Sequence, residues 1–215
     1  MTISTPCPLC KLTDNSKFCS EKSREYLRCL NCDFIFVPQD YHLSKFDEKI
    51  RYDTHNNDPT DERYRDFLSQ LLNPLLERIS NNSKGLDFGS GPGPTLSIML
   101  EEQGHNVDLY DKFYAKNNLV FANKYDFITA TEVIEHLSEP LEEIARLVGM
   151  LKDKSYLAIM TQLFSPTIDF KSWYYKNDPS HIGFFTEKSL EFLAKYLKVS
   201  VHFESDRVIF LQKNI

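Results

Sequence analysis

The stretch Leu86-Asp87-Phe88-Gly89-Ser90-Gly91-Pro92-Gly93 decides the fold of this chain. An apolar run ends in an acid, three glycines follow at alternate positions, and apolar residues at helical spacing then continue to Leu100. This order predicts a strand, a tight turn and a helix, which is the ligand-binding turn of a doubly wound α/β sheet. Glycine suits such a turn because its backbone can approach a ligand closely or take positive φ. Glycine-rich turns also occur without a ligand, so the turn alone leaves its function open.

The spacing of this turn is Asp-x-Gly-x-Gly-x-Gly, which differs from the dinucleotide pattern Gly-x-Gly-x-x-Gly. A carboxylate beside the turn would repel a pyrophosphate. We therefore expect a cationic ligand rich in hydroxyl groups.

Together with two later stretches, the turn resembles motif I of the class I S-adenosylmethionine-dependent methyltransferases. Residues 104–111 are similar to that family's second strand, which ends in the acid that binds the ribose hydroxyls. Residues 125–137 are similar to its fourth strand and the turn beyond, as found in small-molecule and quinone-precursor O-methyltransferases. The resemblance implies S-adenosylmethionine as cofactor, bound by Asp87, Gly89, Ser90, Gly91, Gly93, Asp111 and Glu132.

The core is expected at residues 83–215, as a doubly wound, mostly parallel sheet of the seven-stranded methyltransferase type. Strands are predicted at 84–88, 106–110, 126–130 and 155–160, with a closing antiparallel pair at 198–203 and 207–212. Helices are expected to begin at Ser138-Glu139-Pro140 and at Thr186. Between Asp111 and Asp126 there are too few residues for the usual helix and third strand, so that region is shortened, with Leu119-Val120-Phe121 as its remnant. No adenine-binding side chain can be assigned, although Asn117, Asn118 and Asn123 are open.

The first 45 residues carry two Cys-x-x-Cys pairs, Cys7/Cys10 and Cys29/Cys32, separated by the spacing of a zinc ribbon. Two such knuckles complete a tetrahedral Cys₄ shell, so we expect one structural zinc ion. Disulfides are the alternative, which a reducing compartment and an odd number of cysteines disfavour. Cys19 is expected to be a packed strand residue.

Residues 46–82 are expected to be a helical bridge that covers the cofactor. Asp58 is predicted to cap its helix with Pro59 in the first turn, and Pro74 to kink or split it. Upstream, Tyr52 and His55 lie in a polar segment that either lines the site, as in similar methyltransferases, or is a plain loop.

Candidate bases for a methyl acceptor are His181, His136 and His55, in segments expected at the carboxyl end of the sheet. His181 follows Trp173-Tyr174-Tyr175 on a loop that resembles the substrate side of small-molecule methyltransferases. Glu132, Glu135 and His136 cluster after the fourth strand and could orient substrate, remove a proton or bind a metal. Glu135 and His136 could equally be solvated residues of a helical turn, and the aromatic run could simply pack on the sheet.

Composition limits the partners. The formal net charge of −6 does not favour nucleic acid, whose phosphates bind Lys and Arg. With no readable signal peptide and no apolar run of membrane-spanning length, we expect a cytoplasmic protein that does not engage the membrane.

The sequence therefore predicts a methyltransferase of a small molecule, with O-methylation favoured. Three alternatives stay open: an RNA base methyltransferase, a sugar C-methyltransferase, and a non-catalytic zinc-ribbon scaffold that binds the cofactor.

Overall fold

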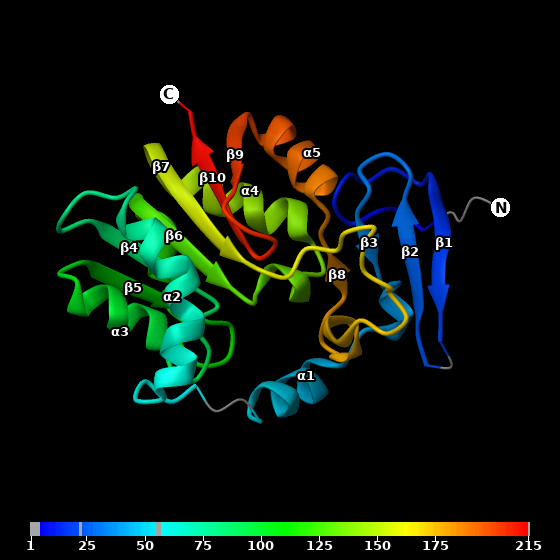
Figure 1. Ribbon diagram of the computed structural model, residues 1–215, viewed down its shortest axis with the longest axis horizontal. Coiled ribbons are helices and arrows are strands. Elements are labelled where there is room, and N and C mark those ends of the chain that lie inside the picture. Colours follow the sequence, from blue (N-terminus) through cyan, green and yellow to red (C-terminus); the bar gives the residue numbers. More distant parts are fainter. Residues whose placement is uncertain (1–4, 22, 55–56, 215) are drawn as a thin grey trace.

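The structure is a computed structural model that describes residues 5–21, 23–54 and 57–214 (Figure 1). Its larger sheet has the strand order β5-β4-β6-β7-β10-β9. The strands are β4 (Lys84–Phe88), β5 (Asn106–Tyr110), β6 (Tyr125–Thr131), β7 (Leu151–Met160), β9 (Val199–Phe203) and β10 (Val208–Lys213). The first four in the order pair in parallel, and β10 is antiparallel to both of its neighbours. The predicted doubly wound, mostly parallel sheet with an antiparallel edge is confirmed.

Helices cover both faces of this sheet. Helices α2 (Glu62–Leu76) and α3 (Thr95–Glu102) pack on one face, and α4 (Pro140–Met150) and α5 (Glu187–Leu197) on the other. The end of strand β7, from Leu157 to Met160, is buried on both sides because its side chains alternate: Leu157 packs with α4 and α5, and Ala158 with α2 and α3. The two predicted helix starts are confirmed, with Pro140 in the first turn of α4 and a capping box at Thr186.

The shortened third-strand region contains no strand. Residues Asn118–Ala122 form the 3₁₀ helix η2, so the prediction that Leu119-Val120-Phe121 is a strand remnant is wrong. The Asn117 side chain accepts a hydrogen bond from the Leu119 N–H, and Val120 is buried beneath the turn. A helical turn pairs backbone N–H and carbonyl groups within itself. A strand here would need a longer connecting segment to reach the edge of the sheet.

A smaller antiparallel sheet has the order β1-β2-β3-β8. The N-terminal segment supplies β1 (Asn15–Ser20), β2 (Glu25–Cys29) and β3 (Ile35–Phe36). The fourth strand, β8 (Gly183–Phe184), comes from the distant C-terminal region and lies beside β3 in Figure 1. The chain therefore returns to the N-terminal sheet after β7. The division into segments 1–45, 46–82 and 83–215 stays a prediction.

Between the two sheets along the chain lie the 3₁₀ helix η1 (Gln39–Tyr41), then α1 (Lys45–Tyr52) and α2. The predicted start of α2 is wrong: Asp58 accepts hydrogen bonds from Thr60 in a turn, and Asp61 caps the helix by accepting from the Arg63 N–H. The predicted split at Pro74 does not occur, because α2 continues through Pro74 and ends at Leu76. None of the helices in the described ranges is both long and apolar enough to cross a membrane.

Candidate active site

A cavity of about 770 Å³ opens at the carboxyl ends of β4, β5 and β6. Ligands of open α/β sheets bind at this edge. Its walls come from α1, α2, the glycine turn, and the segments that follow β5, β6 and β7. The lining includes Arg51, Tyr52, Asn57, Tyr64, Asp87, Gly89, Ser90, Gly91, Gly93, Asp111, Thr131, Glu132, His136, Tyr174, Tyr175, Asp178, His181 and Arg207.

The glycine turn needs its glycines for two reasons. Gly89 and Gly91 take φ of +78° and +64°, in the left-handed region that glycine favours. At Gly93 the neighbouring chain is too close for a side chain, because an added Cβ would lie 2.1 Å from the Asn57 carbonyl oxygen. The turn is thus enclosed by the bridge segment that precedes α2.

Two carboxylates flank the turn. Asp87, 4% exposed, accepts hydrogen bonds of 2.8 Å from both Ser97 and Thr129, and burial raises its pKa. Asp111 accepts from the Gly91 N–H at 3.1 Å and from the N–H groups of Phe113 and Tyr114. Each carboxylate is therefore fixed in place by its neighbours. Among the described residues, no cationic side chain pairs with Asp87.

The polar atoms of the cavity fit S-adenosylmethionine. The hydroxyl oxygens of Ser90 and Thr131 are buried, line the cavity and have no hydrogen-bond partner within the described part of the chain. Buried hydroxyls are normally paired, so these two match a ligand that supplies polar atoms. Asp87 and Asp111 add negative charge and acceptors suited to an ammonium group and ribose hydroxyls. Thr131 escaped the sequence analysis because a threonine at a strand end carries no distinctive pattern.

Two histidines that line the cavity lie next to each other. The ring centroids of His136 and His181 lie 4.7 Å apart. The Nδ1–H of His136 donates to the Ser180 carbonyl at 2.9 Å, and that of His181 to the Tyr175 carbonyl at 2.7 Å. A carbonyl can only accept, so Nε2 of each ring keeps its lone pair. Burial lowers the pKa of His136 to about 3 and that of His181 to about 4, so both rings are neutral near pH 7.

A buried carboxyl stands behind the histidines. Glu135 is fully buried, and its carboxyl hydrogen-bonds to the hydroxyls of Tyr175 and Thr161. Burial, with the nearby charge of Glu132, raises the pKa of Glu135 to about 8. The interpretation of Glu135 as a solvated residue of a helical turn is therefore wrong. Burial also raises the pKa of Glu132, which pairs with Arg207 at 3.2 Å.

One potential ligand atom from each of Glu135, His136 and His181 lies within 4.8 Å of the other two. Two imidazole nitrogens and a carboxylate oxygen form a donor set that divalent transition metals accept.

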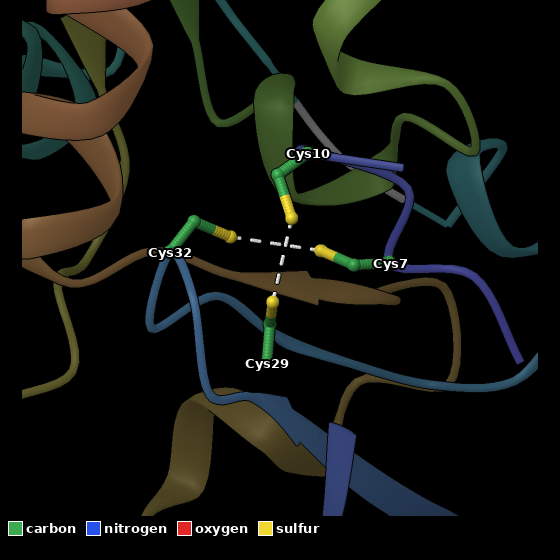
Figure 2. A group of neighbouring side chains, drawn as sticks. All are labelled: Cys7, Cys10, Cys29 and Cys32. Atoms are coloured by element: carbon green, nitrogen blue, oxygen red, sulfur yellow. Dashed lines mark hydrogen bonds between the residues drawn. The ribbon is translucent and has the colours of Figure 1, made fainter. Parts of the chain in front are cut away.

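The four cysteine sulfurs of the ribbon converge on one point (Figure 2). The Sγ atoms of Cys7 and Cys32 lie 3.6 Å apart, and those of Cys10 and Cys29 3.4 Å apart. In a tetrahedral site with Zn–S bonds of about 2.3 Å, neighbouring sulfurs lie about 3.8 Å apart. The thiol set therefore fits one zinc ion. Cys19 lies apart from them in an aromatic cluster, as predicted.

Other predicted residues have mixed outcomes. His55 lies outside the described residues, whereas Tyr52 lines the cavity and contacts the His136 ring edge to face, at 5.3 Å between centroids. Asn117, Asn118 and Asn123 do not line the cavity. Arg51, Asp178 and Arg207 do line it, although the sequence analysis gave them no role there. They come from three separate segments, so only the folded chain brings them together.

A glycine turn with buried acids, beside a cavity at the carboxyl ends of a sheet of this order, is the arrangement expected of an S-adenosylmethionine-dependent methyltransferase. The chain belongs to the methyltransferase domain family, whose profile matches residues 60–196.

Two curated relatives are ubiquinone biosynthesis O-methyltransferases. The one from Erwinia tasmaniensis is 27% identical over 82 residues, covering 38% of this chain and 34% of the relative. The one from Histophilus somni is 30% identical over 109 residues, covering 48% of this chain and 43% of the relative. The matched region thus spans less than half the length of either relative.

Solved structures show the same fold. The 1,6-didemethyltoxoflavin-N1-methyltransferase of Burkholderia thailandensis, with S-adenosylhomocysteine bound, has a TM-score of 0.57 at 14% identity and covers 86% of this chain and 98% of that one. A methyltransferase of Methanosarcina mazei has a TM-score of 0.52 at 15% identity, and the match covers 66% of this chain and 97% of that one.

Proposed function

We propose that this methyltransferase acts on a small molecule and methylates an oxygen atom. The observation that carries the proposal is the pair of neutral, carbonyl-anchored histidines, His136 and His181, which line the cavity together with the glycine turn. The names of the two curated relatives support an oxygen acceptor of small size. The cavity is lined by tyrosines, which suits an organic acceptor better than a nucleic acid.

The proposed cofactor residues are Asp87, Gly89, Ser90, Gly91, Gly93, Asp111 and Glu132. S-adenosylmethionine, when bound, supplies an electrophilic methyl group on a sulfonium. In the proposed arrangement Asp111 accepts ribose hydroxyls, and the turn and Asp87 hold the ligand's polar end. The chain's own contribution is alignment and exclusion of water.

His181 is the proposed base, with His136 second. An acceptor hydroxyl can donate its hydrogen bond to the free Nε2 lone pair, which aims the oxygen lone pair at the methyl group. The proton becomes strongly acidic as the oxygen gains a methyl group. A buried imidazole with a lowered pKa can therefore take that proton late in the transfer, and Asp178 stabilises the charge that results.

We further propose that one structural zinc ion is held by Cys7, Cys10, Cys29 and Cys32. Residues 1–45 then form a zinc-ribbon domain, and residues 83–215 form the methyltransferase core. Segment 46–82 is the proposed cofactor cover, because α1, Asn57 and α2 contribute to the cavity wall. A cytoplasmic location fits these thiols, which are unoxidised in the structure.

The test uses S-adenosylmethionine with a labelled methyl group and three acceptors: 3,4-dihydroxybenzoate, a nucleotide-linked sugar and total RNA. Label in a methyl ether of the phenol supports the proposal. Replacing His181 with Gln should then lower turnover by roughly 10²–10⁴ while leaving calorimetric S-adenosylhomocysteine affinity unchanged.

The other outcomes identify the alternatives. RNase-sensitive label would indicate an RNA methyltransferase, and label on sugar carbon a C-methyltransferase. Tight binding of S-adenosylhomocysteine with no transfer to any acceptor would indicate a scaffold protein.

A further inference from the structure

Residues 173–182, here called the acceptor loop, are the last part of the segment between β7 and β8 and carry Tyr175, Asp178 and His181. Their contacts reach the N-terminal ribbon as well as the core. We propose that the ribbon positions this loop through Arg24, so that the ribbon controls the acceptor side of the cavity and not the cofactor side. The inference rests on the proposed function, in which this loop meets the acceptor.

Arg24, in the turn before β2, makes the most direct connection. Its Nη1 donates to the Asp178 carbonyl at 3.0 Å, and its Nη2 donates to the His181 carbonyl. One planar guanidinium thus binds two backbone oxygens on either side of Pro179-Ser180. Since His181 is the proposed base, this contact fixes the backbone from which its imidazole extends. Hydrogen bonds from a charged donor are among the stronger ones in proteins.

A buried amine makes a second connection. Lys176 of the loop has a side chain only 3% exposed, and its Nζ lies 2.5 Å from a carboxylate oxygen of Glu21 in the ribbon. Its other partner is the Asn177 side chain at 2.9 Å. A buried ammonium without its carboxylate is strongly destabilising. The loop conformation that buries Lys176 therefore requires the ribbon to be in place.

The backbone and the aromatic side chains continue this connection to the cysteine knuckle. The Cys29 N–H donates to the Phe34 carbonyl, and the Val37 N–H donates to the Ile182 carbonyl, each at 2.9 Å. In the register of β3 with β8, Phe36 faces Gly183, where an added Cβ would lie 2.6 Å from the Phe34 ring. Backbone hydrogen bonds and strand pairing thus connect the cysteine knuckle at Cys29, through β3, to the end of the acceptor loop at Ile182.

Among the residues that the structure describes, the glycine turn makes no hydrogen bond or ion pair with the ribbon. The glycine turn is held by β5 and by the bridge, through Asp111 and Asn57. Arg51 of α1 holds the opposite side of the acceptor loop, with its Nη2 2.6 Å from the Asp178 carboxylate. Loss of the ribbon contacts should therefore loosen the acceptor loop and leave cofactor binding intact.

The experiment uses Trp173, the one tryptophan in the sequence, which is buried at the start of the loop among Phe164, Phe170 and Phe184. Acrylamide quenching of its fluorescence is measured in full-length protein, together with amide hydrogen exchange of residues 174–182. The variants are Arg24→Gln and Arg24→Lys, with Arg28→Gln as the control. Arg28 also belongs to the ribbon, but its polar contacts are with Asp33 of the ribbon itself.

We expect Arg24→Gln to increase quenching and to speed exchange in the loop by about tenfold, as for loss of a hydrogen bond to a charged group. Arg24→Lys should restore part of the protection, and Arg28→Gln should match the wild type. Zinc content and S-adenosylhomocysteine affinity should stay the same in all three variants.

The proposal would be overturned if Arg24→Gln showed the same quenching and exchange as the wild type. It would also be overturned if Arg24→Gln lost S-adenosylhomocysteine affinity together with loop protection. Failure of the wild-type protein to bind S-adenosylhomocysteine would instead count against the proposed function. The two failures are distinguishable because the Trp173 and exchange signals need neither cofactor nor acceptor.

Discussion

Replacing His181 with Gln should change how the stability of the protein depends on pH. Burial lowers the pKa of His181 to about 4, against 6.5 for an ordinary histidine. Between these values the unfolded chain binds one more proton at this position than the folded chain. Acidification therefore favours unfolding, and the wild type should lose stability as pH falls from 6.5 towards 4.

The magnitude follows from the two pKa values. A full proton of difference corresponds to about 1.4 kcal/mol for each pH unit. The difference is incomplete near pH 6.5, where the unfolded histidine is half protonated, and again near pH 4. Integration from pH 6.5 to 4.5 leaves about 2 kcal/mol of unfolding free energy lost through this one side chain. Glutamine does not titrate, so the variant should lose about 2 kcal/mol less than the wild type over that range.

The assay is urea denaturation at pH 6.5, 5.5 and 4.5, followed by circular dichroism. His181→Gln should begin less stable at pH 6.5, because the imidazole fills a packed position beside Tyr175. Its free energy of unfolding should then change less with pH than that of the wild type. His202→Gln is the control, since His202 lies on the exposed edge strand β9 with 62% of its side chain accessible. Parallel curves for the wild type and His181→Gln would refute the argument that His181 is held neutral by burial.

Three further predictions concern the cofactor and the metal. Gly91→Val should abolish calorimetric binding of S-adenosylhomocysteine, because valine is strained at φ +64° and its Cβ would lie 3.1 Å from the Asn57 side-chain nitrogen, whereas Gly149→Ala, with open space around its Cβ position, should bind normally. Asp111→Ala should weaken the same binding by roughly 1–3 kcal/mol, the range for a lost buried hydrogen-bond partner; unchanged affinity would remove Asp111 from the site. Elemental analysis should find about one zinc per chain, with less in Cys29→Ser and the same amount in Cys19→Ser. Protein that folds fully without zinc would contradict the structural role.

Much of the fold could be predicted because its signals are local. The run Leu86–Gly93 is read from neighbouring residues, since a strand, a turn that needs positive φ and a helix each leave a short-range pattern. The Cys-x-x-Cys spacing is equally local, because a knuckle places both sulfurs by its own geometry. The errors were also local ones. Asp61 is as good a helix cap as Asp58, and nothing in the adjacent sequence chooses between them.

The candidate site was predicted in part. His136 and His181 were named from their placement after strands, and the structure brings their rings together. That both rings are neutral, with Nδ1 bound to a carbonyl, could not be predicted, because tautomer and pKa depend on burial and on partners far away in sequence. Glu135 illustrates the same limit: in sequence it is one acid beside another, and only packing against Tyr175 and Thr161 makes it a buried carboxyl.

The sequence by itself determined the main strands of the core sheet, the helices that start at Pro140 and after Thr186, the glycine turn and the two Cys-x-x-Cys pairs, because each depends on spacing along the chain. Tertiary structure alone decided that β8 joins the ribbon sheet, that Arg24 binds the acceptor loop 157 residues away at His181, and that Arg207 pairs with Glu132 at the cavity wall. The physical reason is the same in each case. Backbone patterns are set by steric preferences of adjacent residues, whereas the charge, burial and hydrogen bonding of a site are set by side chains that meet only when the chain has folded.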